Sequence, residues 1–129
     1  MSHCDNYTVI YWSPMKALGE FEQLILFAVL KLDGEAFGVR IRQEIEGRTG
    51  REVSAGAIYT TLERLENRGY VFGRLDANSS GRGRPRRYYT LQPEGVQELH
   101  RSYSQLKDMA RGLGVKLEEL ARTGSGTTS

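Results

Sequence analysis

The sequence has few of the residues that build disulfides, metal sites or membrane spans. Its 129 residues include one cysteine, Cys4, and two histidines, His3 and His100. One cysteine cannot form an internal disulfide, and these three side chains are too few for the four ligands of a structural zinc site. No apolar run approaches the roughly 20 residues of a transmembrane helix, and the N-terminus lacks the basic and apolar regions of a signal peptide. We therefore expect a protein of the reducing cytoplasm, with no metal and no membrane partner.

Motifs for catalysis are also absent from the sequence. It contains no cluster of histidine, cysteine and carboxylate residues, no phosphate-binding glycine loop and no nucleophile motif. We therefore expect neither an enzyme nor a cofactor. The hydrophobic fraction of 39% and the charged fraction of 26% are those of one soluble globular domain. The net charge of +2 does not by itself require an anionic partner, so the distribution of charge is more informative than its sum.

The stretch SAGAIYTTLERLENRGY, residues 54–70, predicts the helix around which the chain is organised. Ser54 is a favourable N-cap residue, and Gly69 stands where a left-handed residue commonly ends a helix. Three branched apolar residues recur at helical spacing and form the inner face: Ile58, Leu62 and Leu65. The opposite face is polar: Gly56, Thr60, Glu63, Arg64 and Asn67. A face of this kind is usually only solvated, but it is also compatible with lying against a ligand.

Two further helices are predicted before the central one. Residues 18–32 form a helix that is apolar on almost every side, which predicts burial both within the domain and against a second subunit. Residues 35–46 form a shorter amphipathic helix, in which Gly38 permits close approach of a neighbouring segment. A loop over residues 47–53 joins this helix to the central one, and the pair is typical of a helix-turn-helix motif.

A basic hairpin follows Gly69, where the apolar period changes from helical to two. Strands are predicted over residues 70–75 and 86–91, joined by a loop rich in glycine and serine. Four arginines lie within six residues at its end: Arg82, Arg84, Arg86 and Arg87. Charged loops are usually only solvated, but this loop directly follows a helix-turn-helix pattern, and guanidinium groups match phosphate geometry. The hairpin therefore favours nucleic-acid binding, whereas Arg87 itself is equally well placed to contact the nucleic acid or to pair with an acid such as Glu63 or Glu66.

The last part of the chain, residues 93–121, predicts a long helix that begins with Pro93. Apolar residues recur at alternating spacings of three and four, the pattern of a coiled-coil seam: Val96, Leu99, Tyr103, Leu106, Ala110, Leu113, Leu117 and Leu120. A narrow seam favours a partner helix and hence a homodimer. Gly112 and Gly114 each cost about 1 kcal/mol in a helix interior, so the sequence leaves open whether the helix is interrupted there.

In order and spacing, these residues resemble the PadR family of winged helix-turn-helix transcriptional regulators. The resemblance runs over about residues 18–106 and depends on three segments: FGVRI at 37–41, SAGAIYTTLERLENRGYV at 54–71 and RRYYTLQPEG at 86–95. The chain departs from the family pattern at Ala55 and Thr60, where proline is common, at Val39, where tyrosine is common, and at Gln92, where threonine usually caps the last helix. These departures leave the operator sequence open.

The resemblance implies a mainly α fold with a small β-hairpin and a dimeric transcriptional repressor. The winged helix-turn-helix domain would cover residues 16–92, and a dimerisation helix would cover residues 93–121. Outside them we expect an N-terminal arm over residues 1–15, flexible or packed on the dimer, and a disordered tail over residues 122–129. The resemblance further implies that Tyr59 and the wing arginines contact the DNA backbone.

Three functional hypotheses result. The leading one is a homodimer that binds a palindromic double-stranded operator. Arg64 is the best candidate for reading a guanine. The predicted DNA-contacting residues are Ser54, Gly56, Tyr59, Thr60, Thr61, Arg64, Arg82, Arg84 and Arg86. Its interface would contain Phe21, Ile25, Val96, Leu99, Tyr103, Leu106, Ala110 and Leu113. A second hypothesis adds a small aromatic effector, bound among Trp12, Phe27 and Tyr103. The alternative is a winged-helix module that binds proteins instead of DNA, against which the wing arginines argue.

Overall fold

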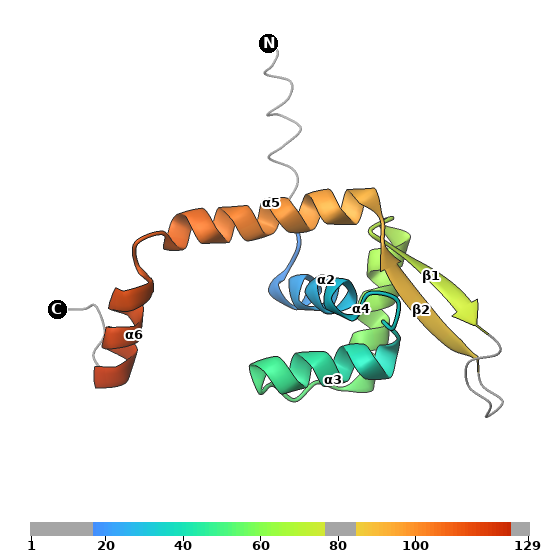
Figure 1. Cartoon of the computed structure of the whole chain (residues 1–129), viewed down its shortest axis with the longest axis horizontal. Coiled ribbons are helices and arrows are strands. Elements are labelled where there is room, and N and C mark those ends of the chain that lie inside the picture. Colours follow the sequence, from blue (N-terminus) through green and yellow to red (C-terminus); the bar gives the residue numbers. More distant parts are fainter. Residues whose placement is uncertain (1–16, 77–84, 125–129) are drawn as a thin grey trace, which may run out of the picture.

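The computed structural model of the chain describes residues 17–76 and 85–124 (Figure 1). Within these ranges the elements follow in this order: α2 (Glu20–Leu32), α3 (Gly38–Thr49), α4 (Ala55–Asn67), β1 (Val71–Asp76), β2 (Arg86–Leu91), α5 (Pro93–Ala110) and α6 (Gly114–Thr123). The fold is mainly helical with one antiparallel hairpin, which confirms the predicted fold class. The predicted arm at residues 1–15 and most of the predicted tail lie outside the described residues.

The hydrophobic core is built around α2, which contacts α3, α4, β2 and α5. Seven large side chains are fully buried there: Ile25, Leu26, Ile41, Ile58, Leu62, Leu65 and Val71. Burying one such side chain contributes about 1.5–3 kcal/mol. Helix α2 is apolar on nearly every side because other elements of the same chain pack around it. Ile25 is 0% exposed, so its prediction as a dimer contact is corrected: it belongs to the core of its own domain.

The ends of α4 are fixed by local interactions that the sequence predicts. The hydroxyl of Ser54 accepts a hydrogen bond from the backbone N–H of Ala57 at 3.1 Å and caps the first turn. At the other end, Gly69 has φ 82°, and the backbone N–H of Tyr70 donates to the carbonyl of Leu65 at 3.0 Å. This is a Schellman termination, in which glycine avoids the steric cost of a left-handed conformation.

The hairpin pairs β1 with β2 in antiparallel register, from Val71 opposite Leu91 to Asp76 opposite Arg86. The observed strands differ from the predicted ones by one residue at most. A third segment adds to the hairpin, because the backbone N–H of Tyr89 donates to the carbonyl of Ala36 at 2.9 Å. The hairpin is therefore joined both to the end of α4 and to the turn that precedes α3 (Figure 1).

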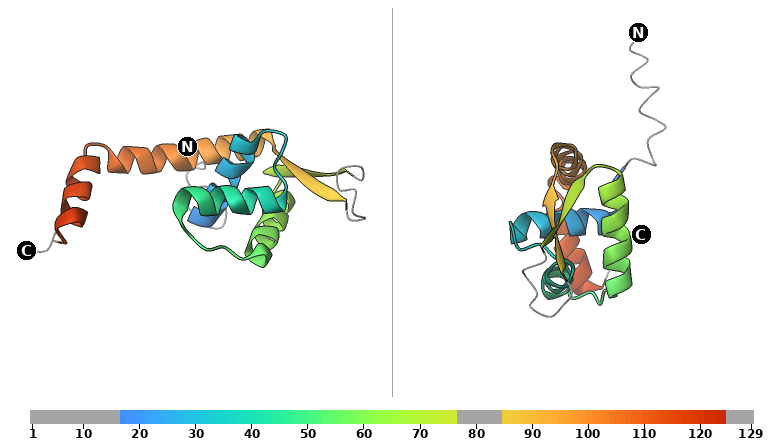
Figure 2. Two further views of the ribbon diagram at one scale, coloured as in Figure 1. Left: turned by 60° about the horizontal axis from the view of Figure 1, so that its bottom comes forward. Right: turned by 90° about the vertical axis from the view of Figure 1, so that its right-hand side faces the viewer.

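The predicted helix over residues 93–121 is divided into α5 and α6. The division lies at Gly112, whose φ of 81° does not continue a helix. Gln92 is the N-cap of α5 and makes no side-chain capping bond. The start of α5 packs on α2 and its remainder extends past the rest of the domain, with α6 turned away at its far end (Figures 1 and 2). None of the helices in the described ranges is both long enough and apolar enough to span a lipid bilayer.

Candidate nucleic-acid interface

The exposed surface of α4 has a small, mostly uncharged outer row between two flanks that carry larger side chains. The outer row consists of Gly56, Thr60, Glu63 and Asn67, all exposed. Thr61 lies elsewhere: it is 3% exposed, because it follows Ile58 by three positions and shares the inner face of the helix. The prediction of Thr61 as a DNA contact is therefore corrected. Gly56 has no atom within 4 Å of the place where a side chain would begin, so the backbone of α4 is accessible at this point.

One flank of α4 carries Tyr59, whose ring lies against the start of α3. A Cβ atom added to Gly38 would lie 2.3 Å from the Tyr59 hydroxyl oxygen and 2.4 Å from the ring carbon that bears it. Only glycine fits under the ring in this position. Tyr59 nevertheless remains 48% exposed. The absence of a side chain at Gly38 therefore sets the direction in which the Tyr59 hydroxyl points.

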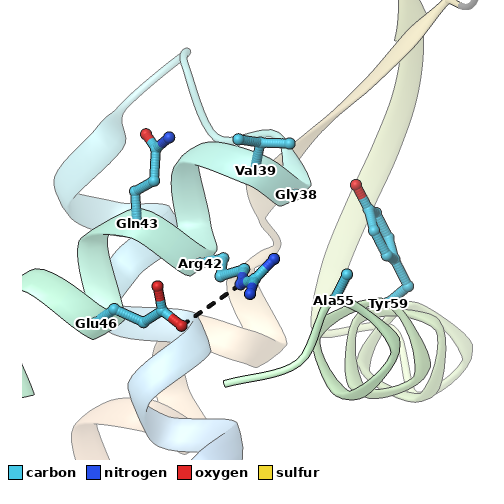
Figure 3. A pocket seen from close by; sticks show the side chains of 7 residues that line it. All are labelled: Gly38, Val39, Arg42, Gln43, Glu46, Ala55 and Tyr59. Atoms are coloured by element: carbon cyan, nitrogen blue, oxygen red, sulfur yellow. Dashed lines mark hydrogen bonds and ion pairs between the residues drawn. The ribbon is translucent and has the colours of Figure 1, made fainter. Parts of the chain in front are cut away.

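A hollow of about 220 Å³ separates α3 from α4 beside Tyr59. It is lined by Gly38, Val39, Arg42, Gln43, Glu46, Ala55 and Tyr59. Figure 3 shows the guanidinium of Arg42 pointing from α3 towards α4, with its Nε 3.5 Å from Oε2 of Glu46. The same Glu46 oxygen accepts a hydrogen bond from the backbone N–H of Val53 at 2.9 Å. Glu46 thus positions Arg42 and also holds the loop that leads into α4.

The pKa of Glu46 is lowered, first by the hydrogen bond from Val53 and then by the positive charge of Arg42. The folded protein lowers this pKa below its ordinary value of 4.5, which is also its value in the unfolded chain. The charged Glu46 side chain therefore contributes its full stabilisation of the fold at pH values above the unfolded pKa. This stabilisation is lost as the pH falls through the folded pKa.

A Glu46→Gln variant should therefore melt at a lower temperature than the wild type at neutral pH, and the difference should shrink in acid. The measurement is a series of thermal melts from neutral pH to about pH 3. Glu63→Gln, on the exposed outer row of α4, is the matched control. A difference between Glu46→Gln and the wild type that stays constant with pH would contradict the role given to this charge.

The hairpin of β1 and β2, which we call the wing, is held against α4 by Glu66. Its Oε2 lies 2.9 Å from Nη2 of Arg87 and accepts a hydrogen bond from the backbone N–H of Gly73 at 3.2 Å. The hydrogen bond to Glu66 raises the pKa of Arg87 above its ordinary value. A side chain at Gly73 would begin 2.5 Å from Nε of Arg87, so a Cβ here would displace the Arg87 side chain from its present position. Of the two partners that the sequence leaves open for Arg87, the structure shows Glu66.

Two arginine side chains of the hairpin stack on aromatic rings, one at the loop end of β2 and one midway along β1. The guanidinium carbon of Arg86 is 4.3 Å from the centre of the Phe37 ring, and that of Arg74 is 5.4 Å from the centre of the Tyr88 ring. Phe37 and Tyr88 meet edge to face, with their centres 5.3 Å apart. Cation–π contacts of this kind hold the arginines in place while their outer N–H groups stay accessible. Arg82 and Arg84 lie outside the described residues.

The other flank of α4 carries Arg64, which forms an ion pair with Glu22 of α2. Nε of Arg64 is 3.4 Å from Oε2 of Glu22, while the Arg64 side chain remains 53% exposed. The sequence identifies Arg64 as a candidate but gives no sign of Glu22, because the two residues lie far apart in the chain. Arg42, Glu46 and Gly73 are also missed, although their partners lie only four to seven positions away, because no sequence pattern marks these contacts.

Some of the residues predicted for a dimer interface and an effector pocket are buried in the domain, and others lie exposed on its surface. Leu99 is 4% exposed and is corrected to a core residue, whereas the rest of the seam on α5 and beyond is exposed: Val96, Tyr103, Leu106, Ala110 and Leu113. Phe21 is half-buried beside Arg51. Phe27 and Tyr103 meet edge to face at 6.1 Å between ring centres, and Trp12 lies outside the described residues.

The fold is similar to that of known transcriptional regulators. A PadR family regulator from Eggerthella lenta is 22% identical over 92% of this chain and 97% of its own, with a TM-score of 0.58. A PadR family regulator from Clostridium difficile is 21% identical over 75% and 98% of the two chains, with a TM-score of 0.61. A PadR-like regulator from Bacillus cereus is 24% identical over 78% and 90%, with a TM-score of 0.59. No curated protein sequence matches the chain.

Sequence identities of 21–24% to these solved structures show a shared fold. Membership of the family is shown by a separate sequence comparison. The sequence model of the transcriptional regulator PadR-like family matches residues 26–101, which is more than half of the chain. The matched part contains α3, α4, the hairpin and the first half of α5, that is, every described residue of the candidate interface except Glu22. The chain therefore belongs to the PadR-like family of transcriptional regulators, which are DNA-binding proteins and not enzymes.

Proposed function

We propose that this protein represses transcription by binding a palindromic DNA operator as a homodimer. The observation that carries the proposal is the joint placement of α4 and the wing. Glu66 fixes the hairpin strands to α4 through Arg87 and Gly73, so α4 and the strands that carry the basic loop would meet one duplex together. The small outer row of α4 allows close approach to base edges, and arginines on both sides match phosphates.

In this proposal α4 enters the major groove with its N-terminal end first. Ser54, Gly56 and Thr60 are exposed there, and the Tyr59 hydroxyl would donate a hydrogen bond to a phosphate. Arg64 would read a guanine, since a bidentate contact of this type contributes about 1–3 kcal/mol of discrimination. Arg82, Arg84 and Arg86 would mainly contact the backbone, and for the first two the assignment rests on the sequence alone.

The proposed dimer uses the exposed apolar side chains on α5 and α6. Leu106 is 61% exposed, and Met109, between the seam positions, is 79% exposed. Exposed apolar side chains in a row of this length are typical of an interface. Residues 93–121 would thus form the dimerisation segment and residues 16–92 the DNA-binding domain. A two-fold axis would place the half-sites about 34–36 Å apart, one turn of the duplex.

A small aromatic effector is proposed to bind beside Phe27 and Tyr103. Their edge-to-face contact joins α2 to α5, so a ligand that separates the rings would change the angle between the DNA-binding domain and the dimerisation segment. Because Trp12 is the single tryptophan of the chain, its fluorescence would report an aromatic compound bound near it. No change on titration with such compounds would count against an effector site that includes Trp12.

Replacing both Arg82 and Arg84 with alanine should weaken binding to every DNA sequence by a similar factor. Each lost phosphate contact should reduce the magnitude of the slope of log affinity against log salt concentration by about 0.9. The double variant loses two such contacts, so its slope should be reduced by about twice this amount. Binding is measured by fluorescence anisotropy at several salt concentrations. A matched control replaces Lys116 and Arg122 of α6, which removes the same charge away from α4.

Two outcomes would contradict the proposal. An unchanged salt slope in the Arg82 and Arg84 variant would remove the wing from the interface. Failure of the wild-type protein to shift any fragment of a random genomic pool would favour the alternative, a winged-helix module that binds proteins.

A further inference from the structure

The carboxylate of Glu22 connects the start of α2 with the flank of α4. Its Oε1 accepts a hydrogen bond from the backbone N–H of Gly19 at 2.8 Å and so caps α2. Nη1 of Arg68 lies 3.4 Å from the same oxygen, and Nε of Arg64 lies 3.4 Å from Oε2. The Glu22 side chain is only 13% exposed. Figure 2 shows the N-terminal end of α2 beside α4.

The two arginines that contact Glu22 differ in their exposure and therefore in how much the contact can stabilise the fold. Arg68 is 23% exposed, and its guanidinium carbon is 5.4 Å from the centre of the Tyr70 ring. Arg68 can therefore join α4 to α2 by itself. Arg64 is 53% exposed, and ion pairs with so much solvent contribute little to stability. The second contact of Glu22 therefore adds little to stability, but it places the carboxylate against Nε of Arg64.

The direction of the Arg64 side chain matters because of which N–H groups Glu22 uses. A guanidinium has five donors in a rigid fork, and Glu22 accepts from Nε of Arg64. This contact leaves the two Nη groups unused, on a side chain that is 53% exposed as a whole. A guanine offers two acceptors, O6 and N7, in the major groove, and arginine reads them by donating two hydrogen bonds at once. An arginine already held in one orientation loses less conformational freedom when it makes this contact.

We propose that Glu22 is a positioning residue for DNA sequence recognition, which aims the Nη groups of Arg64 at a base edge. The inference rests on the proposed function, since it requires α4 to enter the major groove. Without Glu22, Arg64 keeps its charge but can reach any phosphate nearby. Binding then depends more on total charge and less on sequence.

The test is the Glu22→Gln variant, which keeps the shape of the side chain and an oxygen for the Gly19 N–H. Affinities are measured for a duplex that the wild-type protein selects from a randomised pool and for a scrambled duplex of the same composition. The ratio of the two affinities should fall about tenfold, the loss of one bidentate base contact. Affinity for the scrambled duplex should stay the same or rise, because an acidic group near the phosphates has been removed.

Glu20→Gln is the matched control. Glu20 lies in the same turn of α2 and is 78% exposed, but it pairs with Arg51 and not with α4. Removing its charge should leave the ratio unchanged. In an Arg64→Ala background, Glu22→Gln should cause no further loss of the ratio, since it acts through Arg64.

The alternatives give different results. A lower melting temperature with an unchanged ratio would make Glu22 purely structural and overturn the inference. A higher ratio would also overturn it, because Glu22 would then be withholding Arg64 from the DNA. If the wild-type protein selects no sequence from the pool, the proposed function itself fails, and that failure is visible before any variant is compared.

Discussion

Replacing Gly95 with alanine should lower the free energy of unfolding by about 3 kcal/mol, near the upper end of the usual cost of overpacking. Gly95 is buried in the first turn of α5, where an added Cβ would lie 2.2 Å from the carbonyl oxygen of Tyr70. This neighbour is a backbone atom, so no rotation of a side chain can relieve the overlap. The same oxygen accepts a hydrogen bond from the backbone N–H of Gln92 at 2.9 Å, which holds it in place.

The strain at Gly95 can be relieved only by moving α5 away from the start of the hairpin. Such a movement would draw Leu99, now 4% exposed, out of the core and weaken the contact between α5 and α2. For a domain whose whole stability is about 5–15 kcal/mol, the loss is a large fraction. Thermal unfolding followed by circular dichroism should show a decrease in melting temperature of roughly 10 °C.

Gly114→Ala is the matched control for this prediction. Gly114 begins α6 and has no atom within 4 Å of the place where an alanine Cβ would lie, so alanine should be neutral or stabilise the protein by up to about 1 kcal/mol. Equal melting temperatures for Gly95→Ala and the wild type would mean that α5 does not pack against Tyr70 as described.

Local features of the sequence predict most of the fold. Ser54 and Gly69 mark the ends of α4 because capping and left-handed termination depend only on neighbouring backbone groups. The hairpin follows from the change of apolar period. By contrast, the requirement for glycine at Gly95 arises from the backbone of Tyr70, which is distant in the chain, and no local pattern reveals it.

The sequence also leaves the destination of an apolar side chain undecided. Leu99 fits a dimer seam by spacing and Ile25 lies on a helix that is apolar on almost every side, yet both are buried within their own domain. An apolar pattern identifies a face that is covered and not what covers it. The same limit applies to charge. Arg64 and Arg87 are both prominent in the sequence, which offers Glu66 as one possible partner of Arg87, but only the fold shows that Arg64 pairs with Glu22. Gly112 interrupts the last helix through its positive φ, which the heptad pattern does not reveal.

Replacing Gly38 with alanine should weaken DNA binding by about tenfold to a hundredfold while the protein stays folded. The added methyl group would occupy the space of the Tyr59 hydroxyl and the ring carbon beside it. Tyr59 is half-exposed, so its ring can rotate away at little cost in stability. A hydroxyl that donates to a charged phosphate contributes about 1.5–3 kcal/mol, and a displaced ring would lose that contact.

Affinity for a selected duplex and melting temperature are measured together on Gly38→Ala, Tyr59→Phe and Gly47→Ala. Tyr59→Phe removes the hydroxyl without moving the ring and should weaken binding to a similar extent. Gly47→Ala changes a glycine of the same helix that has open space around it, so its affinity should match the wild type. Because only the first two variants alter the Tyr59 hydroxyl, a loss confined to them assigns the effect to that group. Unchanged affinity in Tyr59→Phe would instead show that the hydroxyl does not contact the DNA backbone.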